Sequence, residues 1–281
     1  MKQILATLKA DAELVSTELS KIFSVKDPDY DVLFKSMRYS ALDTAGKRVR
    51  PFLTLEFSRA LGGTDEKALP LAAAVEMVHT YSLIHDDLPC MDDDDERRGM
   101  PSNHKVFGEA TALLAGDGLL TLAFSVICSS ETLSDTQKVQ AVKLLADCAG
   151  VYGMIGGQQI DLLGETVKLT EAQHKKMNLL KTGAMIKAAA LMGCIAANAD
   201  EHAFTCASDY AESVGLAFQV KDDLLDIGEE DEKTTYLSFM SKEDATSLVA
   251  SLTEKAISAL SDIPNSNILA LTAEFLRDRT V

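Results

Sequence analysis

Apolar residues recur at three- and four-residue spacing along most of the chain, which is the pattern of helices with a buried face. The stretches that carry this spacing are rich in Ala, Leu and Met and lie at 66–88, 108–130, 136–150, 171–197 and 203–227. The alternation of β-branched residues that marks strands is scarce. Breaks are predicted at Gly62 and Gly63, at 89–102, around Gly164 and at 228–234. The pattern predicts an all-α protein.

The chain shows no Ser- or Pro-rich linker and no shift in composition between its halves. We therefore predict that residues 1–281 form a single domain, a bundle of roughly ten or more helices. Two ordinary domains are the alternative that this length allows.

Acidic residues outnumber basic ones, with 43 Asp and Glu against 27 Lys and Arg, so the formal net charge is −16. This balance argues against nucleic acid as a partner and against docking on anionic lipid, since both require clustered cations. Two explanations of the acidity remain open, general solubility or carboxylates gathered to hold cations. The positions of the acids decide between them.

The five cysteines are odd in number and have no CxxC spacing, which favours a reducing cytoplasm over a disulfide framework or a zinc site. Lys9, Asp11 and Glu13 interrupt the apolar run that a signal peptide would need. No uncharged apolar run reaches the roughly 18 residues of a membrane span. We expect no stable membrane insertion.

Seven acids occupy the eleven positions from Asp86 to Glu96, at the end of an apolar helix. Pro89 disfavours helix for the residue before it, so the helix should end near Asp87 or Leu88. Two adjacent carboxylates would then face the negative end of the helix dipole, which calls for a nearby cation or the Arg97–Arg98 pair. Asp92, beyond the proline, can fold back to share that cation.

A second acidic group, FQVKDDLLD, ends another predicted helix. Asp222 and Asp226 are four residues apart and share a face with Gln219, where like charges repel unless a metal joins them. Oxygen ligands without His or Cys suggest Mg²⁺, which commonly bridges to phosphate. A solvated acidic face is the alternative for either group alone, and the presence of both favours metal.

Basic residues gather in AGKRVRP, which holds Lys47, Arg48 and Arg50, and in KTG, which holds Lys181 and Thr182. Lysine supplies a point charge and arginine a bidentate fork, a pair suited to diphosphate. No GxxxxGK[ST] loop is present. His79 lies two turns before Asp86 on the same helix face. Two interpretations are open: His79 contacts a diphosphate, or it is an ordinary helix histidine that makes a structural hydrogen bond.

Together these motifs resemble the trans-isoprenyl diphosphate synthases, closest to the bacterial farnesyl diphosphate synthases. The resemblance runs from about Met37 to about Phe239 through GKRVRP, EMVHTYSLIHDDLPCMDDDDERRG, NHKVFGEATALLAGDGLL, GGQQIDL, KTG and FQVKDDLLD. It implies the isoprenoid synthase fold, a helical bundle around a central cavity, and a homodimer. It also implies three Mg²⁺ ions between the two aspartate motifs.

The resemblance assigns roles to individual residues of this sequence. Metal ligands are Asp86, Asp87, Asp92, Asp222 and Asp226, with Asp223 a weaker candidate. The allylic diphosphate is bound by Arg97, Lys181, Thr182 and Gln219, and isopentenyl diphosphate by Lys47, Arg50, His79 and Arg98. The residues expected to carry the catalysis are Asp86, Asp87, Arg97, Lys181 and Asp222.

The implied reaction is ionisation of an allylic diphosphate, attack by the double bond of isopentenyl diphosphate, and proton loss to the released diphosphate. Residues five and four positions before Asp86, which are Tyr81 and Ser82, bear on product length in this family. Aromatic Tyr81 is similar to enzymes that stop at C15. We therefore expect farnesyl diphosphate from dimethylallyl or geranyl diphosphate, with a geranylgeranyl diphosphate synthase as the alternative.

Two segments depart from the family pattern. One extra residue stands between Tyr39 and Lys47, and the loop after the second aspartate motif, at 228–234, is shortened. A lysine that normally contacts the allylic diphosphate is missing there, and Lys233 is the candidate to replace it. The shortened loop motivates a further alternative, a weakly active or non-catalytic partner subunit. A terpene cyclase would not need GKRVRP and Arg98.

Overall fold

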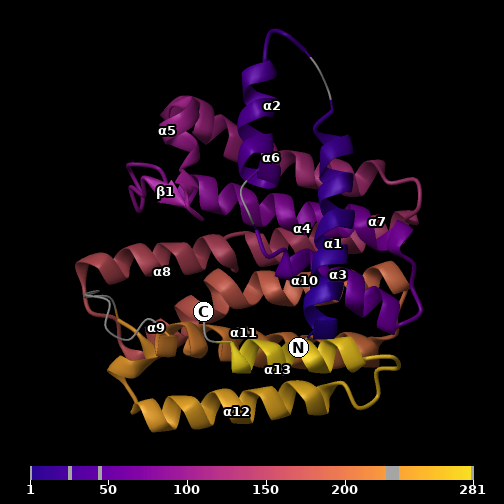
Figure 1. Ribbon diagram of the computed structural model, residues 1–281, viewed down its shortest axis with the longest axis vertical. Helices are drawn as coiled ribbons and strands as arrows, with labels where there is room; N and C mark the ends of the chain where they lie inside the picture. The colour runs from indigo at the N-terminus through magenta and orange to yellow at the C-terminus, as the bar shows by residue number, and fades with distance from the viewer. Residues whose placement is uncertain (1, 25–26, 44–45, 226–233, 280–281) are drawn as a thin grey trace.

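The computed structural model describes residues 2–24, 27–43, 46–225 and 234–279. These residues fold almost entirely into helices joined by short turns (Figure 1). The α-helices are α1 (Lys2–Ile22), α2 (Asp31–Arg38), α3 (Val49–Ala60), α4 (Asp65–Asp86), α5 (Asn103–Phe107), α6 (Glu109–Ser129), α7 (Asp135–Ala149), α8 (Met154–Thr166), α9 (Glu171–Asn178), α10 (Ala184–Ala197), α11 (Glu201–Leu225), α12 (Lys242–Ala259) and α13 (Asn267–Asp278). The other elements are the π-helical turns η1 (Tyr39–Asp43) and η2 (Leu179–Gly183), the 3₁₀ turn η3 (Tyr236–Ser238), and a hairpin of β1 (Glu96–Arg97) and β2 (Met100–Pro101). The prediction of an all-α fold is confirmed.

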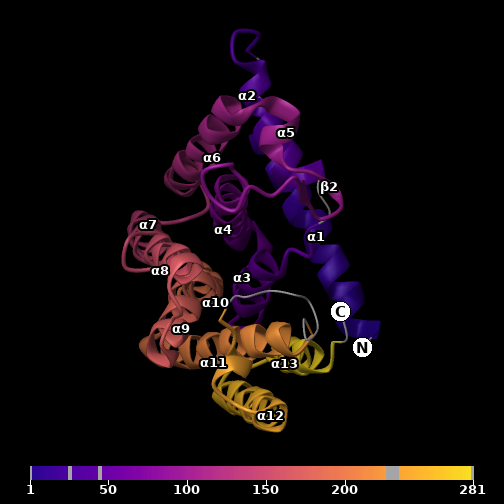
Figure 2. The same cartoon turned by 90° about the vertical axis from the view of Figure 1, so that its left-hand side faces the viewer.

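Helix α4 is the most enclosed of the long helices. Its residues 71–78 are all buried, so the helix is apolar on nearly every side, as expected of a central helix. It packs against α1, α3, α6 and α10, and Figure 2 shows α6 above it with α10 and α11 below. Because α4 is packed against neighbouring helices, its C-terminal end has a defined position in the molecule. This end carries the first acidic cluster.

Close approach of α10 to α3 completes the wall beside α4. A Cβ atom on Gly193 would lie 2.5 Å from the Cβ of Phe57 and 2.6 Å from the carbonyl oxygen of Thr54. The hydroxyl of Thr54 donates to the carbonyl oxygen of Ala189, 2.9 Å away. Glycine therefore lets the two backbones touch.

The predicted helix at 171–197 is interrupted, because α9 and α10 are joined by the π-helical turn η2. Apolar spacing cannot distinguish a π turn from an α turn, since the wide turn adds one residue without changing composition. The predicted break around Gly164 lies a few residues later in the structure, because α8 runs through Gly164 to Thr166 and the next helix begins only at Glu171. A Cβ atom on Gly164 would lie 3.2 Å from Cδ1 of Leu169, so the side chain of Leu169 packs close to this glycine.

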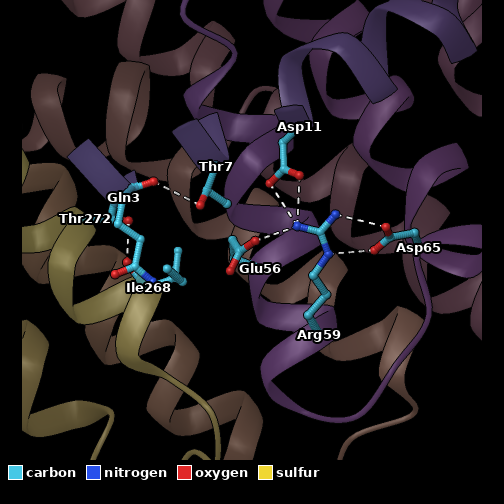
Figure 3. Close-up of polar contacts among 8 residues, drawn as sticks. All are labelled: Gln3, Thr7, Asp11, Glu56, Arg59, Asp65, Ile268 and Thr272. Carbon is cyan, nitrogen blue, oxygen red and sulfur yellow. Dashed lines mark hydrogen bonds and ion pairs between the residues drawn. The ribbon is translucent and has the colours of Figure 1, made fainter. Parts of the chain in front are cut away.

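One arginine joins the N-terminal helix to the centre of the molecule (Figure 3). Arg59 of α3 donates to Asp11 of α1 at 2.8 Å, to Glu56 at 2.5 Å and to Asp65 at the start of α4 at 2.7 Å. Burial opposes the charge of Arg59, but the hydrogen bonds to Asp65 and Asp11 outweigh it and raise its pKa. Burial raises the pKa of Asp11 and of Glu56, although both accept hydrogen bonds from Arg59. Three carboxylates thus share one guanidinium.

A large cluster of buried apolar side chains extends from Ile4 in α1 to Leu276 in α13, and a smaller second cluster joins Val220, Tyr236, Ala245 and Val249. Two helical stretches, α6 and residues 171–197, are also long and apolar enough to cross a membrane by length and composition. Of the most apolar window in each, 33% is buried for α6 and 67% for the second stretch. Core helices of water-soluble proteins satisfy the same criterion, so the predicted lack of membrane insertion stays a prediction.

Candidate active site

The first acidic cluster forms a tight turn beyond the end of α4. Asp86 is the last residue of the helix and Asp87 caps it, which matches the predicted end. The backbone NH of Asp92 donates to the carbonyl oxygen of Asp86, 2.8 Å away. The chain therefore folds back after Pro89 and returns Asp92 to the helix end.

Arg97 balances one side of this turn. Its Nε donates to Oδ1 of Asp87 at 2.8 Å, and its Nη2 donates to the same oxygen and to Oδ2 of Asp94, the latter at 2.8 Å. Asp87 is only 2% exposed, and burial raises its pKa while Arg97 opposes the rise. The positive charge that the helix dipole argument requires is thus present at Asp87.

Asp86 and Asp92 are less well compensated. Burial raises the pKa of Asp86 to about 6, with Lys181 acting against the rise and Asp92 adding to it. One oxygen of Asp92, Oδ1, is buried without a hydrogen-bond partner. Two neighbouring carboxylates with this deficit of positive charge suit a divalent cation with oxygen ligands.

Lys181 and Thr182 lie in the π-helical turn η2. Nζ of Lys181 is 2.5 Å from Oδ2 of Asp161 on α8. A Cβ atom on Gly157 would lie 2.2 Å from the backbone nitrogen of Lys181, so only glycine allows α8 to approach η2 this closely. The π turn and Gly157 together place the lysine beside Asp86.

The second acidic group ends α11, where Gln219 and Asp222 lie one turn apart. Asp222 accepts a hydrogen bond from Nη2 of Arg279, a residue just beyond α13. The backbone NH of Tyr236 donates to Oδ2 of Asp223, 2.6 Å away, so this neighbour is turned toward η3. Asp226 and Lys233 lie outside the described residues.

A positively charged group lies on the side of α4 that faces α3. Nη1 of Arg50 is 3.3 Å from Nε2 of His79. The side chain of Arg98 reaches the same region beside Gly46. A Cβ atom on Gly46 would lie 2.6 Å from Nη1 of Arg98. Lys47 is exposed, and neither Lys47 nor Arg98 lines the cavity that contains Arg50, His79 and Asp86.

Arg48, next to this group, has a structural role. It is buried, adopts a left-handed backbone conformation at φ 52°, and donates to Glu76 and to the carbonyl oxygen of Ala41. Burial lowers the pKa of Arg50 below its ordinary value, and Arg98 adds to the fall, while the carboxylate of Glu76, only 2% exposed, opposes it. Three arginines therefore surround one buried acid, which leaves positive charge to bind an anion.

His79 is held in its neutral form. Its pKa lies well below the ordinary value, because it is buried and because Arg50, Arg98 and Arg48 repel a second positive charge. A neutral imidazole can donate one hydrogen bond and accept another. At neutral pH His79 can therefore orient a diphosphate oxygen without adding charge.

A cavity of about 350 Å³ brings several of these groups together. Its lining includes the basic or imidazole side chains of Arg50, His79 and Lys181, together with Asp86, Thr182, Tyr81 and Ser82. The rest of the lining is mainly apolar and includes Leu83, Met91, Met154, Ile155 and Leu162. A lining that combines charged side chains with apolar ones suits a ligand with an anionic head and a hydrocarbon chain.

Tyr81 is well placed to limit this cavity. The residue is 5% exposed, its ring packs edge-on against His85 at a centroid distance of 5.6 Å, and its hydroxyl is buried without a hydrogen-bond partner. Burial raises its pKa to about 12. The hydroxyl of Ser82 instead donates to the carbonyl oxygen of His79, 2.9 Å away.

Two residues of α8 were not predicted as part of the site. Asp161 binds Lys181, and Gln158 lines the cavity with both polar atoms of its amide buried and without partners. The motif GGQQIDL places them three residues apart, on one face of a helix. That spacing was the available signal.

A further unpredicted group lies in and after the acidic loop. Ligand atoms of Asp93, Asp95 and His104 lie within 4.8 Å of one another. Asp95 is also 2.5 Å from Nζ of Lys105. The lysine already supplies a cation to this group.

Comparisons with known proteins identify the family of this chain. A family model described as polyprenyl synthetase matches residues 31–254. The chain belongs to the polyprenyl synthetase family. The predicted family resemblance is thereby confirmed.

Individual relatives of the polyprenyl synthetase family narrow the chemistry. The farnesyl diphosphate synthase of Bacillus subtilis (strain 168) is 40% identical over 260 residues, covering 87% of this chain and 88% of the relative. The geranylgeranyl diphosphate synthase of Cyanophora paradoxa is 38% identical over 292 residues, covering 98% of this chain and 96% of the relative. The apo crystal structure of an FPP/GFPP synthase from Zymomonas mobilis superimposes with a TM-score of 0.92 at 34% identity, covering 98% of this chain and 99% of that one.

The likeness to these relatives shows that this polyprenyl synthetase is a prenyltransferase of isoprenoid biosynthesis. It acts on diphosphate substrates and depends on divalent metal. Because farnesyl and geranylgeranyl diphosphate synthases both match, the comparisons leave the product length open.

Proposed function

We propose that this prenyltransferase is a farnesyl diphosphate synthase, which condenses dimethylallyl or geranyl diphosphate with isopentenyl diphosphate to a C15 product. The observation that carries the proposal is the cavity itself. Its lining combines Arg50 and His79, which can bind an anion, with the carboxylate of Asp86 and the aromatic ring of Tyr81.

The metal in this proposal is Mg²⁺, with three ions per site. Asp86, Asp87 and Asp92 would hold it at the end of α4, and Asp222 with Asp226 at the end of α11. The buried, unpartnered Oδ1 of Asp92 and the raised pKa of Asp86 support this assignment. When bound, the ions neutralise charge that builds up on the departing diphosphate.

Side chains of the protein bind the two diphosphate substrates and exclude water. Lys181, Thr182, Gln219 and Arg97 hold the allylic diphosphate, and Lys233 is proposed to assist from outside the described residues. Arg50, His79 and Arg98 hold isopentenyl diphosphate, with the exposed Lys47 at the rim. The apolar cavity excludes water from the allylic cation, and the released diphosphate takes the proton.

Product length is proposed to depend on Tyr81. Because its ring lies in the cavity wall and is packed against His85, it can stop the growing chain, whereas Ser82 is too small to do so. The Tyr81→Met variant should therefore make longer products than C15. Tyr81→Phe keeps the ring and should not.

The test is an incubation of purified protein with Mg²⁺, geranyl diphosphate and isopentenyl diphosphate, followed by chain-length analysis. A C15 product supports the proposal. A mainly C20 product would instead identify a geranylgeranyl diphosphate synthase, the activity in the name of the Cyanophora relative. An unchanged distribution in Tyr81→Met would show that Tyr81 does not limit the chain.

The shortened loop at 228–234 supports one further candidate, a partner subunit with little activity of its own. No elongation by the protein alone, with activity restored by a second subunit, would favour this candidate. An Asp86→Ala variant with full activity would contradict the metal assignment in either case.

We also propose a homodimer that acts in the cytoplasm, with residues 1–281 as one polyprenyl synthetase domain. The large apolar cluster from Ile4 to Leu276 supports the single domain. The dimer is supported by exposed apolar side chains on α6, in the turn before α8 and in its first turn, namely Leu113, Leu114, Val151, Tyr152 and Ile155.

A further inference from the structure

The last described residue of the chain lies against the second acidic group. Arg279 follows α13 and has an extended backbone, with φ −62° and ψ 147°. Its Nη2 donates to Oδ1 of Asp222 and to the carbonyl oxygen of Phe218, the latter 3.1 Å away. Its guanidinium carbon lies 4.1 Å from the centre of the Phe218 ring.

These contacts hold the arginine firmly in place. The side chain of Arg279 is only 10% exposed, whereas that of Asp222 is 34% exposed. A guanidinium over an aromatic face and against a carboxylate gains from both interactions. Yet Nε of Arg279 is buried without a hydrogen-bond partner, so the hydrogen-bonding capacity of the guanidinium is not fully used.

The position of Arg279 matters because Asp222 is the proposed metal ligand of α11. A guanidinium bonded to Oδ1 places a positive charge next to any cation that this carboxylate would bind. The two cations repel each other and compete for the same carboxylate. Binding of metal at Asp222 is therefore opposed by the energy of the arginine contact.

Release of the arginine does not require the helix to unfold. Arg279 lies one residue beyond the end of α13, and the contacts described above are made by its side chain. Arg277 and Asp278, its neighbours, pair with each other at the exposed surface. The end of α13 can stay folded while Arg279 leaves Asp222.

We propose that Arg279 is a positioning residue that occupies Asp222 in the metal-free protein and must leave before metal binds there. It keeps the carboxylate in place without a metal and couples the end of α13 to metal occupancy. The inference rests on the proposed function, which makes Asp222 a metal ligand.

The test measures Mn²⁺ binding by electron paramagnetic resonance of the free ion, with inorganic diphosphate present, for the full chain and its variants. Arg279→Gln should bind Mn²⁺ about five-fold more tightly at the Asp222-dependent site, which corresponds to about 1 kcal/mol. Arg279→Lys keeps the charge and should stay closer to the wild type. Arg277→Gln, the matched control in the exposed pair, should bind as the wild type does.

The Asp222→Asn variant separates the two proposals. In that background Arg279→Gln should have no effect on Mn²⁺ affinity. If Asp222→Asn weakens binding while Arg279→Gln leaves it unchanged or weakens it, the inference is overturned and the metal site stands. If Asp222→Asn binds Mn²⁺ as tightly as the wild type, both the inference and the metal role of Asp222 are overturned.

Discussion

Asp86 shows how a single carboxyl group can be prepared for a cation by its surroundings. The end of a buried helix, a neighbouring Asp92 and partial burial all disfavour its negative charge. Lys181 acts in the opposite direction but is shared with Asp161. The protonation of Asp86 should therefore be visible near neutral pH.

The contribution of Asp86 to the stability of the metal-free protein should grow as the pH falls from 7 to about 4. The pKa of Asp86 is about 6 when folded, above its ordinary value of 3.8. The folded state therefore takes up a proton that the unfolded state does not, and the gain reaches up to about 3 kcal/mol. Urea unfolding of wild type and Asp86→Asn across this pH range measures it.

The Asp86→Asn variant should lose this part of the pH dependence, and the exposed Asp147→Asn variant should keep it. Protons and metal compete for Asp86, so Mn²⁺ affinity of the wild type should fall below pH 6. A metal affinity independent of pH between 5 and 7 would contradict the role given to Asp86.

At the scale of residues, the sequence predicted Lys181 and Asp222 as part of the site but not the side chains that bind them. Pro89 and the apolar helix before Asp86 predicted where the acids stand, because both are local features. The partners of Lys181 and Asp222 were not predicted, since Asp161 is 20 residues and Arg279 57 residues away along the chain. Only the packing of helices brings such pairs together.

At the scale of elements, the contact between α8 and η2 controls where Lys181 lies. The Gly157→Ala variant would place a methyl group 2.2 Å from the backbone nitrogen of Lys181. The helices must then separate, which should cost about 2 kcal/mol of stability and at least about ten-fold in activity.

The matched control is Gly183→Ala, in the same turn, where the nearest atom to the new methyl group would be 3.5 Å away. Its unfolding temperature should stay close to that of the wild type. Thermal unfolding of both variants decides the matter, and equal temperatures would show that α8 can move without cost.

The Arg59 cluster gives a second prediction for elements, since it ties α1 to α3 and α4. The Arg59→Gln variant leaves Asp11 and Glu56 buried without a cation and should lose about 3 kcal/mol at pH 7. The pKa of both acids is already raised by burial, so they can protonate at pH 5 and the loss should shrink.

Urea unfolding at the two pH values measures this difference. Arg277→Gln removes an exposed pair and should change stability by less than about 0.5 kcal/mol at either pH. A loss in Arg59→Gln that is the same at pH 5 and pH 7 would indicate that the two acids do not titrate.

Helix positions followed closely from apolar spacing. The stretch 108–130 became α6 (Glu109–Ser129), and 136–150 became α7 (Asp135–Ala149). The π turn at Leu179–Gly183 escaped prediction because the apolar pattern continues through it. The break predicted around Gly164 comes after Thr166, because a single glycine costs only about 1 kcal/mol inside a helix and does not by itself end it.

At the scale of the whole molecule, exposed apolar side chains on α6 and next to the start of α8 predict that two copies of the chain associate. Leu114 is 56% and Tyr152 89% exposed, and burial of such side chains in a second copy would favour a dimer. The Leu114→Asp/Tyr152→Asp double variant should sediment as one chain of 30.3 kDa, and the wild type as two.

Leu5→Asp provides the control, since Leu5 is 49% exposed but lies on α1. It should leave the sedimentation of the dimer unchanged. A wild-type protein that sediments as a single chain would rule out the proposed homodimer.

The arrangement of helices around the cavity was expected only through the family resemblance. Spacing and composition predicted the helices but not which of them would be neighbours, because contacts such as that of α3 with α10 join segments more than a hundred residues apart. The cavity is a property of those contacts.

The packing of α1 against α13 links opposite ends of the described chain. During synthesis the first helix emerges long before its last partner exists, and Ile4 and Val15 would meanwhile expose apolar surface. Closing such a long loop is slow and leaves time for wrong associations. The N-terminal helix is therefore the segment for which help from a chaperone would matter most while the chain is still being made.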